Sequence, residues 1–159
     1  MILYFLRHGL AGLRSEWEGD DWGRPLTEEG ITRTAKTGKL LAEMGLNIDR
    51  IITSPLVRAK QTAKIVAGKM NLEDRLIEDE HLVPGFDHNK LSEILSDYQE
   101  DECILFVGHE PDFSLTFSSL IRGGEIVCKK GGLARVDILD RKSLTGQLIW
   151  LIPPKFLAG

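Results

Sequence analysis

Arginine and histidine side chains follow two predicted strands of this sequence, at positions where a sheet usually binds its ligands. Arg7 and His8 come directly after the apolar run 2–6, and His109 follows a second apolar run, 103–107. The carboxyl ends of parallel strands form the ligand-binding edge of open α/β sheets. Guanidinium groups bind phosphate oxygens in pairs and stay charged at any relevant pH. The sequence therefore predicts an anion site centred on Arg7 and His8.

A second arginine is predicted near the start of a helix. Ser54 is interpreted as the N-cap and Pro55 as the first helical residue, which puts Arg58 in or beside the first turn. A cation there opposes the helix dipole, and it is more natural where an anion shares the space. Alone, Arg58 would be interpreted as a solvated surface residue. Because Arg58 follows another predicted strand, 49–53, we expect it to belong to the anion site.

The chemistry that these residues support is phosphoryl transfer. A neutral imidazole is a competent nucleophile toward phosphorus, and arginines neutralise the charge that would repel it. His8 is the better nucleophile because it follows its strand directly. A backbone carbonyl that holds its Nδ1–H would leave Nε2 free to attack. His109 is then predicted to donate to a phosphoryl oxygen, and Gly9, Ser54 and Gly108 to support the phosphate pocket.

The remaining pattern alternates strands and helices. The apolar runs 2–6 and 103–107 predict central strands that are covered on both faces. The other predicted elements are helices from Thr27 to about Gly45 and over 54–70, 89–98 and 111–121, strands over 49–53 and 75–78, and an antiparallel hairpin of 134–138 with 148–151. This order predicts an α/β fold with a mostly parallel sheet and an antiparallel edge. No linker or repeat interrupts residues 1–159, so a single domain is expected.

Two segments are predicted to be irregular. The stretch from 10 to 26 is rich in glycine and acidic residues, and whether it covers the site is left open. Its Trp17 and Trp22 are expected to pack onto the domain, with a pocket rim as the alternative. Pro153 and Pro154 are interpreted as the end of the sheet, followed by a loose tail.

Composition narrows the classes of partner. A net charge of -4 argues against broad nucleic-acid binding but permits a local arginine cluster that binds an anion. Cys103 and Cys128 lack metal-type spacing, which favours reduced thiols in a cytoplasmic protein. No segment approaches 18 consecutive apolar residues, so no membrane association is expected. The histidines have no carboxylate-rich ligand set around them, so neither a metal nor another cofactor is expected.

The sequence also resembles a known family. Leu6-Arg7-His8-Gly9 matches the Arg-His-Gly signature of the histidine phosphatase (phosphoglycerate mutase-like) superfamily. Further matches, in the family's order and spacing, are Pro25-Leu26-Thr27 with Gly30, Ser54-Pro55-Leu56-Val57-Arg58-Ala59 with Gln61-Thr62-Ala63, and Gly108-His109-Glu110-Pro111. The resemblance implies a three-layer α/β/α domain and a covalent phosphohistidine on His8. It also implies that Arg7, Arg58 and His109 complete the phosphate pocket.

The short chain, with few insertions, most resembles the SixA-type branch of this family. Those small enzymes remove phosphate from phosphohistidine in signalling proteins. The resemblance therefore implies a phosphohistidine-bearing protein as partner and a role in signal transduction. An open crevice suits a protein-borne substrate better than a small metabolite.

The sequence departs from the family pattern at the general acid. Many members place a glutamate after the third strand to protonate the leaving oxygen. Here His81 occupies the aligned position and Glu80 precedes it, so either is a candidate proton donor. A protonated phosphohistidine releases neutral imidazole and needs no strong acid, whereas an alkyl phosphate does. The departure therefore favours a P–N substrate.

Two alternative functions remain open at this point. A small-molecule phosphomonoester phosphatase or mutase could use the same pocket. A non-catalytic phosphoprotein-binding module would need only the arginines, so His8 and His109 argue against it. The preferred hypothesis is a metal-independent phosphatase that acts through phospho-His8.

Overall fold

A mixed six-stranded sheet forms the centre of the fold, in a computed structural model that describes residues 1–159. The strands are β1 (Ile2–Arg7), β2 (Arg50–Thr53), β3 (Leu76–Glu78), β4 (Cys103–Gly108), β5 (Leu133–Asp140) and β6 (Thr145–Ile152). Their order in the sheet is β3-β2-β4-β1-β5-β6. β1 to β4 are parallel, β5 is antiparallel to β1, and β6 is antiparallel to β5. The predicted mostly parallel sheet with an antiparallel edge is confirmed.

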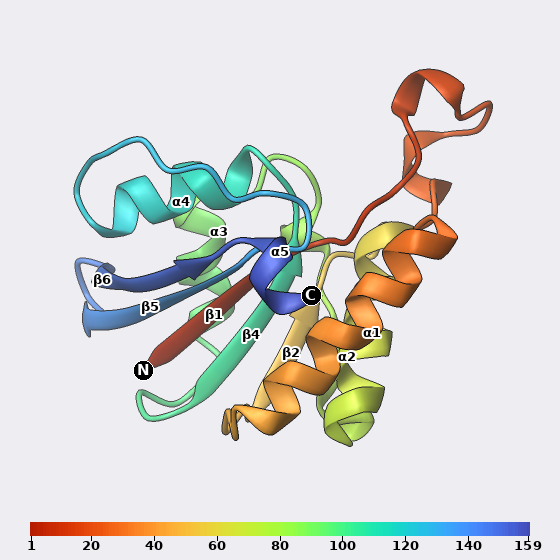
Figure 1. Cartoon of the computed structure of the whole chain (residues 1–159). Coiled ribbons are helices and arrows are strands. Elements are labelled where there is room, and N and C mark those ends of the chain that lie inside the picture. Colours follow the sequence, from red (N-terminus) through yellow and green to blue (C-terminus); the bar gives the residue numbers. More distant parts are fainter.

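Helices cover both faces of this sheet, which gives the predicted three layers (Figure 1). They are α1 (Glu28–Glu43), α2 (Val57–Met70), α3 (His88–Leu95), α4 (Asp112–Leu120) and α5 (Pro154–Leu157), with short 3-10 turns η1 (Arg14–Glu16), η2 (Asp21–Gly23), η3 (Glu73–Arg75) and η4 (Glu80–Leu82). α1 and α2 pack on one face, and α3 and α4 pack on the other. None of the helices combines the length and apolar composition that crossing a membrane requires.

The side chains of β1 divide between the two cores, as expected for a strand covered on both faces. Leu3 and Phe5 point to the side of α3 and α4, whereas Tyr4 and Leu6 point to the side of α1 and α2. Phe5 meets the ring of Phe106 at a centroid distance of 5.2 Å. Full burial of such a side chain contributes about 2–3 kcal/mol. The end of β1, where Arg7 and His8 lie, is therefore held firmly.

The start of α2 differs from the prediction. The helix begins at Val57, and its N-cap residue is Leu56, which makes no side-chain cap. The Ser54 hydroxyl instead accepts a hydrogen bond from the Leu56 N–H at 3.3 Å and also contacts His109. The prediction of Ser54 as N-cap and Pro55 as first helical residue was therefore wrong. Arg58 still falls in the first turn, as expected.

The C-terminal tail also differs from the prediction. Pro154 begins the short helix α5 instead of a loose end, since proline is well suited to the first position of a helix. Leu157 is only 2% exposed and joins the core on the side of α1. The two prolines thus end the sheet, as predicted, but they also start an element that packs against α1.

Residues 10–26 form an arm that leaves the carboxyl end of β1 and returns to the start of α1. A bridge pairs Ala11 with Leu26, and the Leu10 carbonyl accepts the Thr27 N–H at 3.0 Å. A Cβ on Gly30 would lie 2.0 Å from the Leu10 oxygen, so this close approach requires glycine. Figure 1 shows the arm projecting from the body of the molecule. Trp22 is 44% exposed on it, so the expectation that this tryptophan packs onto the domain was wrong.

Candidate active site

His8 lies directly beyond β1 and is held by backbone bonds on both sides. Its N–H donates to the Gly108 carbonyl at 3.0 Å, and its own carbonyl accepts from the Gly131 N–H at 3.1 Å. The ring nitrogen Nδ1 lies 2.8 Å from the Gly9 carbonyl oxygen, which can only accept a hydrogen bond. Nδ1 therefore carries the proton, and Nε2 keeps its lone pair.

The charge state of His8 follows from its surroundings. The residue is 5% exposed. Burial, and after it the nearby His109, Arg58 and Arg7, lower the pKa of His8 well below its usual value. The ring is therefore neutral at physiological pH, the state in which an imidazole is a nucleophile.

A buried hydroxyl connects the turn after His8 to α2. The Gly9 N–H donates to Thr62 Oγ1 at 3.0 Å, and that hydroxyl donates to the Arg58 carbonyl at 2.8 Å. Thr62 is 1% exposed, so both bonds lie away from water. The peptide that orients His8 and the helix turn that carries Arg58 are thus joined through one side chain.

All three nitrogens of the Arg58 guanidinium group have partners. Nε donates toward His8 Nε2 at 3.3 Å. The other two nitrogens bond the Asp21 carbonyl oxygen at 2.8 Å and the Asp21 carboxylate at 3.1 Å. Asp21 belongs to η2 on the arm, so the arm reaches the site through this residue.

Arg7 and His109 each have one buried polar atom without a partner. The Arg7 guanidinium donates to the Cys128 carbonyl at 2.8 Å, while its Nε is unpaired. His109 Nε2 lies 2.8 Å from Ser54 Oγ, while its Nδ1 is unpaired. Burial lowers the pKa of His109 to about 3, so this ring is also neutral. The centroids of the His8 and His109 rings are 5.3 Å apart.

The structure therefore brings the four predicted residues together at the carboxyl ends of β1 and β4 and the start of α2. The three predicted pocket supports each contact one of the two histidines: Gly9 and Gly108 bond to His8, and Ser54 bonds to His109. A Cβ on Gly108 would lie 2.7 Å from Phe113 Cζ. That packing leaves no room for a side chain at the end of β4.

The two candidate proton donors lie apart from this hydrogen-bonded group. Glu80 is exposed, and His81 lies beside it in η4. His81 Nδ1 lies 2.7 Å from Asp79, its Nε2 is 3.2 Å from Glu93, and the hydrogen bond to Asp79 raises the pKa of His81. Neither candidate forms a hydrogen bond or an ion pair with the four residues.

Three charged residues of the site were missed by the sequence analysis. Asp21 pairs with Arg58 and also with Arg24, whose Nε is 2.8 Å from the carboxylate. Burial lowers the pKa of Lys130, and the positive charges of Arg7, Arg24 and Arg58 lower it further, so this lysine lies near the same cations. A sequence feature that could have indicated Lys130 is the run Lys129-Lys130-Gly131-Gly132. It lies directly before β5, the strand that pairs with β1.

Comparison with known proteins identifies the family. Residues 3–83 match the histidine phosphatase superfamily (branch 1). An uncharacterised protein of Picosynechococcus sp. is 32% identical, in an alignment that covers 99% of both chains. The chain belongs to the histidine phosphatase superfamily. The resemblance inferred from the sequence is thereby confirmed.

Solved structures share the fold of the protein. The protein histidine phosphatase SixA, solved with tungstate, superposes with a TM-score of 0.87 at 26% identity, over 99% of both chains. A mycobacterial glucosyl-3-phosphoglycerate phosphatase superposes with a TM-score of 0.71, over 96% of this chain and 98% of that one. At 15% identity, the second likeness shows the fold alone.

Several phosphoglycerate mutases match only part of the chain. The 2,3-bisphosphoglycerate-dependent phosphoglycerate mutase 2 of Bacteroides thetaiotaomicron is 39% identical over 72 residues. That alignment covers 45% of this chain and 29% of the mutase. The mutase therefore contains long segments that have no counterpart in the match.

The histidine phosphatase match ends before the fourth residue of the site. Arg7, His8 and Arg58 lie within residues 3–83, whereas His109 lies beyond them. Its place beside His8 follows from the pairing of β1 with β4, in which Arg7 lies opposite Gly108.

Proposed function

We propose that the protein is a phosphohistidine phosphatase that moves a phosphoryl group from a signalling protein first to His8 and then to water. The observation that carries the proposal is the state of the His8 ring. Its Nδ1–H is 2.8 Å from the Gly9 oxygen, and its Nε2 lone pair faces Arg58 Nε at 3.3 Å. A neutral, oriented imidazole beside a fixed cation is the arrangement that attack on a phosphoryl group requires.

In the first step, His8 Nε2 forms a bond to phosphorus while the P–N bond of the substrate breaks. The electron pair of that bond returns to the substrate imidazole. This ring leaves as neutral imidazole because its other nitrogen takes a proton from solvent before the attack. The phosphorylated His8 ring is then positively charged, and the Gly9 oxygen stabilises it by accepting the Nδ1–H.

In the second step, water attacks phosphorus and the bond to His8 Nε2 breaks. His8 leaves as the neutral imidazole with which the cycle began, and the protons of the water stay with the released phosphate. No external acid is needed in either step, since both leaving groups are neutral imidazoles.

Three other side chains act on the phosphoryl oxygens. Arg58 and Arg7 neutralise the negative charge, and each is buried enough for this interaction to be strong. In this proposal His109 donates from Nδ1, while its Nε2 accepts from the Ser54 hydroxyl, whose oxygen already accepts the Leu56 N–H. A phosphoryl oxygen also supplies the partner that buried Arg7 Nε and His109 Nδ1 otherwise lack.

The choice of phosphohistidine over a phosphate ester has two supports. An ester needs an acid for its alkoxide, and the candidates Glu80 and His81 make no bond to the site. The likeness to the protein histidine phosphatase SixA extends over 99% of both chains. A small-molecule phosphatase or mutase is the second candidate, favoured by the 39% identity to the mutase over 72 residues.

A substrate panel tests the proposal. We would compare kcat/KM for a phosphorylated histidine-phosphotransfer protein, free phosphohistidine, sugar phosphates and phosphoglycerates, with His8→Ala as control. We expect the phosphorylated protein to be preferred at least tenfold, about 1.4 kcal/mol of transition-state binding, and His8→Ala to be inactive. A tenfold preference for the metabolites supports the second candidate, and full turnover by His8→Ala contradicts both.

A further inference from the structure

Two adjoining hollows lie on the face between α1 and α5. The first has a volume of about 410 Å³ and includes Arg7 in its wall. The second has a volume of about 500 Å³ and shares Arg33, Pro154 and Ala158 with the first. We call the two together the basic groove, after the cations that line it: Arg7, Arg33, Lys36, Lys129, Lys130 and Lys155. Arg7 belongs both to the first hollow and to the proposed phosphate pocket, so the groove adjoins that pocket at this residue.

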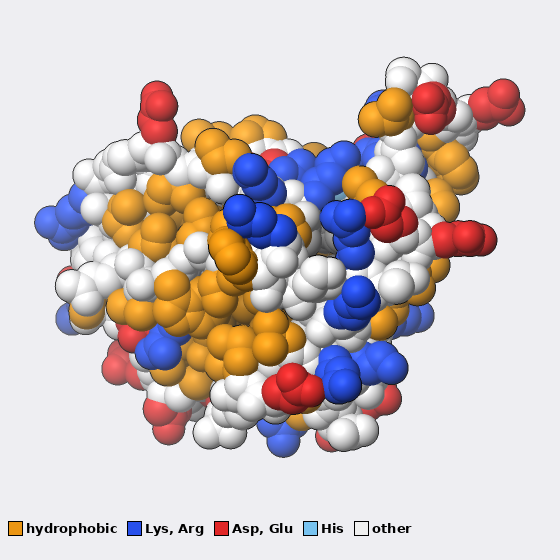
Figure 2. Space-filling model, in the orientation of Figure 1, with side chains coloured by type: hydrophobic (Ala, Val, Ile, Leu, Met, Phe, Trp, Pro, Cys, Tyr) orange, Lys and Arg blue, Asp and Glu red, His pale blue; other side chains and the backbone are white.

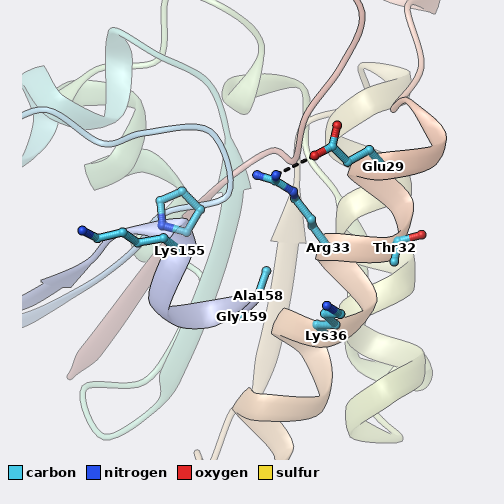
Figure 3. Close-up of a pocket in the computed structure, with 8 residues that line it drawn as sticks. Glu29, Thr32, Arg33, Lys36, Lys155, Ala158 and Gly159 are labelled. Carbon is cyan, nitrogen blue, oxygen red and sulfur yellow. Dashed lines mark ion pairs between the residues drawn. The ribbon is translucent and has the colours of Figure 1, made fainter.

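The charge of the basic groove is opposite to that of the whole chain. Glu29 is its one acidic side chain, and it pairs with Arg33 at 2.5 Å (Figure 3). None of the four lysines forms an ion pair within the protein. Figure 2 shows positively charged side chains gathered along this face, although the net charge is -4. The groove therefore offers unneutralised positive charge to a ligand.

The cations are arranged for a ligand larger than a second phosphate group. Arg33 and Lys36 are exposed on α1, and Lys155 is exposed on α5, where Figure 3 shows its side chain extending away from α1. Unlike Arg7 and Arg58 of the phosphate pocket, they are spread along an open surface, and the one guanidinium among them, Arg33, is paired with Glu29. Dispersed carboxylates on another protein match dispersed lysines better.

An apolar surface borders the basic groove. Phe156 is 65% exposed on α5. Figure 2 shows hydrophobic side chains gathered over β1, β5 and β6, where Ile2, Trp150 and Ile152 are only partly buried. Protein interfaces combine an apolar centre with a charged, solvated rim. The combination favours a protein over a small metabolite as the occupant.

We infer that the basic groove binds acidic side chains of the protein that carries the phosphohistidine, and so directs that phosphohistidine to His8. This inference rests on the proposed function. It assigns a specificity role to Lys36 and Lys155, which line only the second hollow and contact none of the proposed catalytic residues.

The test uses the double variant Lys36→Glu/Lys155→Glu in the full chain. Its control is Lys39→Glu/Lys64→Glu, which makes the same change in net charge at two exposed lysines outside the groove. The probes are a phosphohistidine peptide flanked by glutamates, the same peptide with glutamines in their place, and free phosphohistidine. Circular dichroism and thermal unfolding verify that both variants fold.

We expect Lys36→Glu/Lys155→Glu to lower kcat/KM for the acidic peptide at least tenfold, through KM, and to leave free phosphohistidine unaffected. The difference should shrink as salt is raised, because exposed charges are screened. Equal loss on both peptides, no loss, or the same loss in the control variant overturns the inference.

The wild-type protein separates this inference from the proposed function. If it hydrolyses all three probes with the same kcat/KM, the docking role is wrong and the phosphohistidine activity stands. If it leaves all three intact while hydrolysing phosphate esters, the proposed function is wrong and the docking role falls with it.

Discussion

Arg58 Nε lies 3.3 Å from His8 Nε2, so the guanidinium group points an N–H at the atom that we propose attacks phosphorus. Both side chains are at least 95% buried, which strengthens their interaction with a phosphoryl group. Removal of one such donor from a transition-state pocket typically costs about a hundredfold to a thousandfold in kcat.

We therefore expect Arg58→Ala to lower kcat by about a hundredfold or more. Arg58→Lys should recover only part of the loss, because an ammonium group restores the charge but not the planar fork. Steady-state kinetics on free phosphohistidine measures both variants. A kcat within threefold of wild type in Arg58→Ala would contradict the role of this residue.

Asp21 places a carboxylate on the same guanidinium group, at 3.1 Å. Arg24 and Arg58 outweigh its partial burial and lower the pKa of Asp21, so it is ionised at neutral pH and repels a bound anion. Removal of that charge should tighten the binding of inorganic phosphate about fivefold, or about 1 kcal/mol, the energy in water of two unit charges about 4 Å apart. The inhibition constant of phosphate as a competitive inhibitor, measured in the wild type and in Asp21→Ala, gives this change in affinity.

The control for this experiment is Glu18→Gln, which removes one negative charge from an exposed position on the same arm. It should leave the inhibition constant of phosphate unchanged. An equal effect in both variants would mean that net charge, and not the contact with Arg58, sets the affinity.

Thr62 joins the turn after His8 to α2, and its loss should affect stability and catalysis together. Thr62→Val leaves the buried Gly9 N–H without a partner, which costs about 1–3 kcal/mol. It also frees the Gly9 peptide that orients the His8 ring. Thr62→Ser keeps the hydroxyl and should retain most of kcat. Urea unfolding measures the effect on stability, and steady-state kinetics measures the effect on kcat. Equal kcat in Thr62→Val and Thr62→Ser would exclude a role of the Thr62 hydroxyl in orienting His8.

The low pKa of His109 predicts a loss of stability in acid. The unfolded chain binds a proton at this residue below about pH 6.5, whereas the folded protein resists protonation down to about pH 3. The unfolded state then holds more protons, so stability falls as pH falls, by about 1 kcal/mol per pH unit from this residue. His8, whose pKa is also lowered, acts in the same direction.

Urea unfolding between about pH 6 and about pH 4 checks this prediction. His109→Gln should show a shallower decline in unfolding free energy than the wild type, because the variant lacks one of the two groups. Parallel declines in the two proteins would show that His109 is not held neutral by the fold.

The sequence predicted those features that depend on local pattern. Apolar runs identified β1 and β4, and residue type at their ends identified Arg7, His8 and His109. Because a hydroxyl before a helix usually caps it, the sequence predicts Ser54 as a helix N-cap, which is wrong. Its actual partner, His109, is 55 residues away and becomes its neighbour only when β2 pairs with β4.

The local pattern could not predict which charged residues join the site through contacts between distant parts of the chain. Asp21 reaches Arg58 only through the path of the arm. Lys130 approaches the site because β5 returns antiparallel to β1. The α5 helix was missed because Pro154 is compatible both with a chain end and with a helix start, and only the packing of Leu157 favours the helix.

Detection of a phosphoryl group on His8 during turnover tests the central claim most directly. The enzyme is mixed with labelled phosphohistidine, quenched in alkali within the first turnover, and digested with trypsin. The digest should contain a phosphorylated peptide 8–14, in which His8 is the sole histidine, and its label should be stable in alkali and lost in acid. Absence of label from this peptide in an active enzyme, or equal labelling in His8→Ala, would contradict the account.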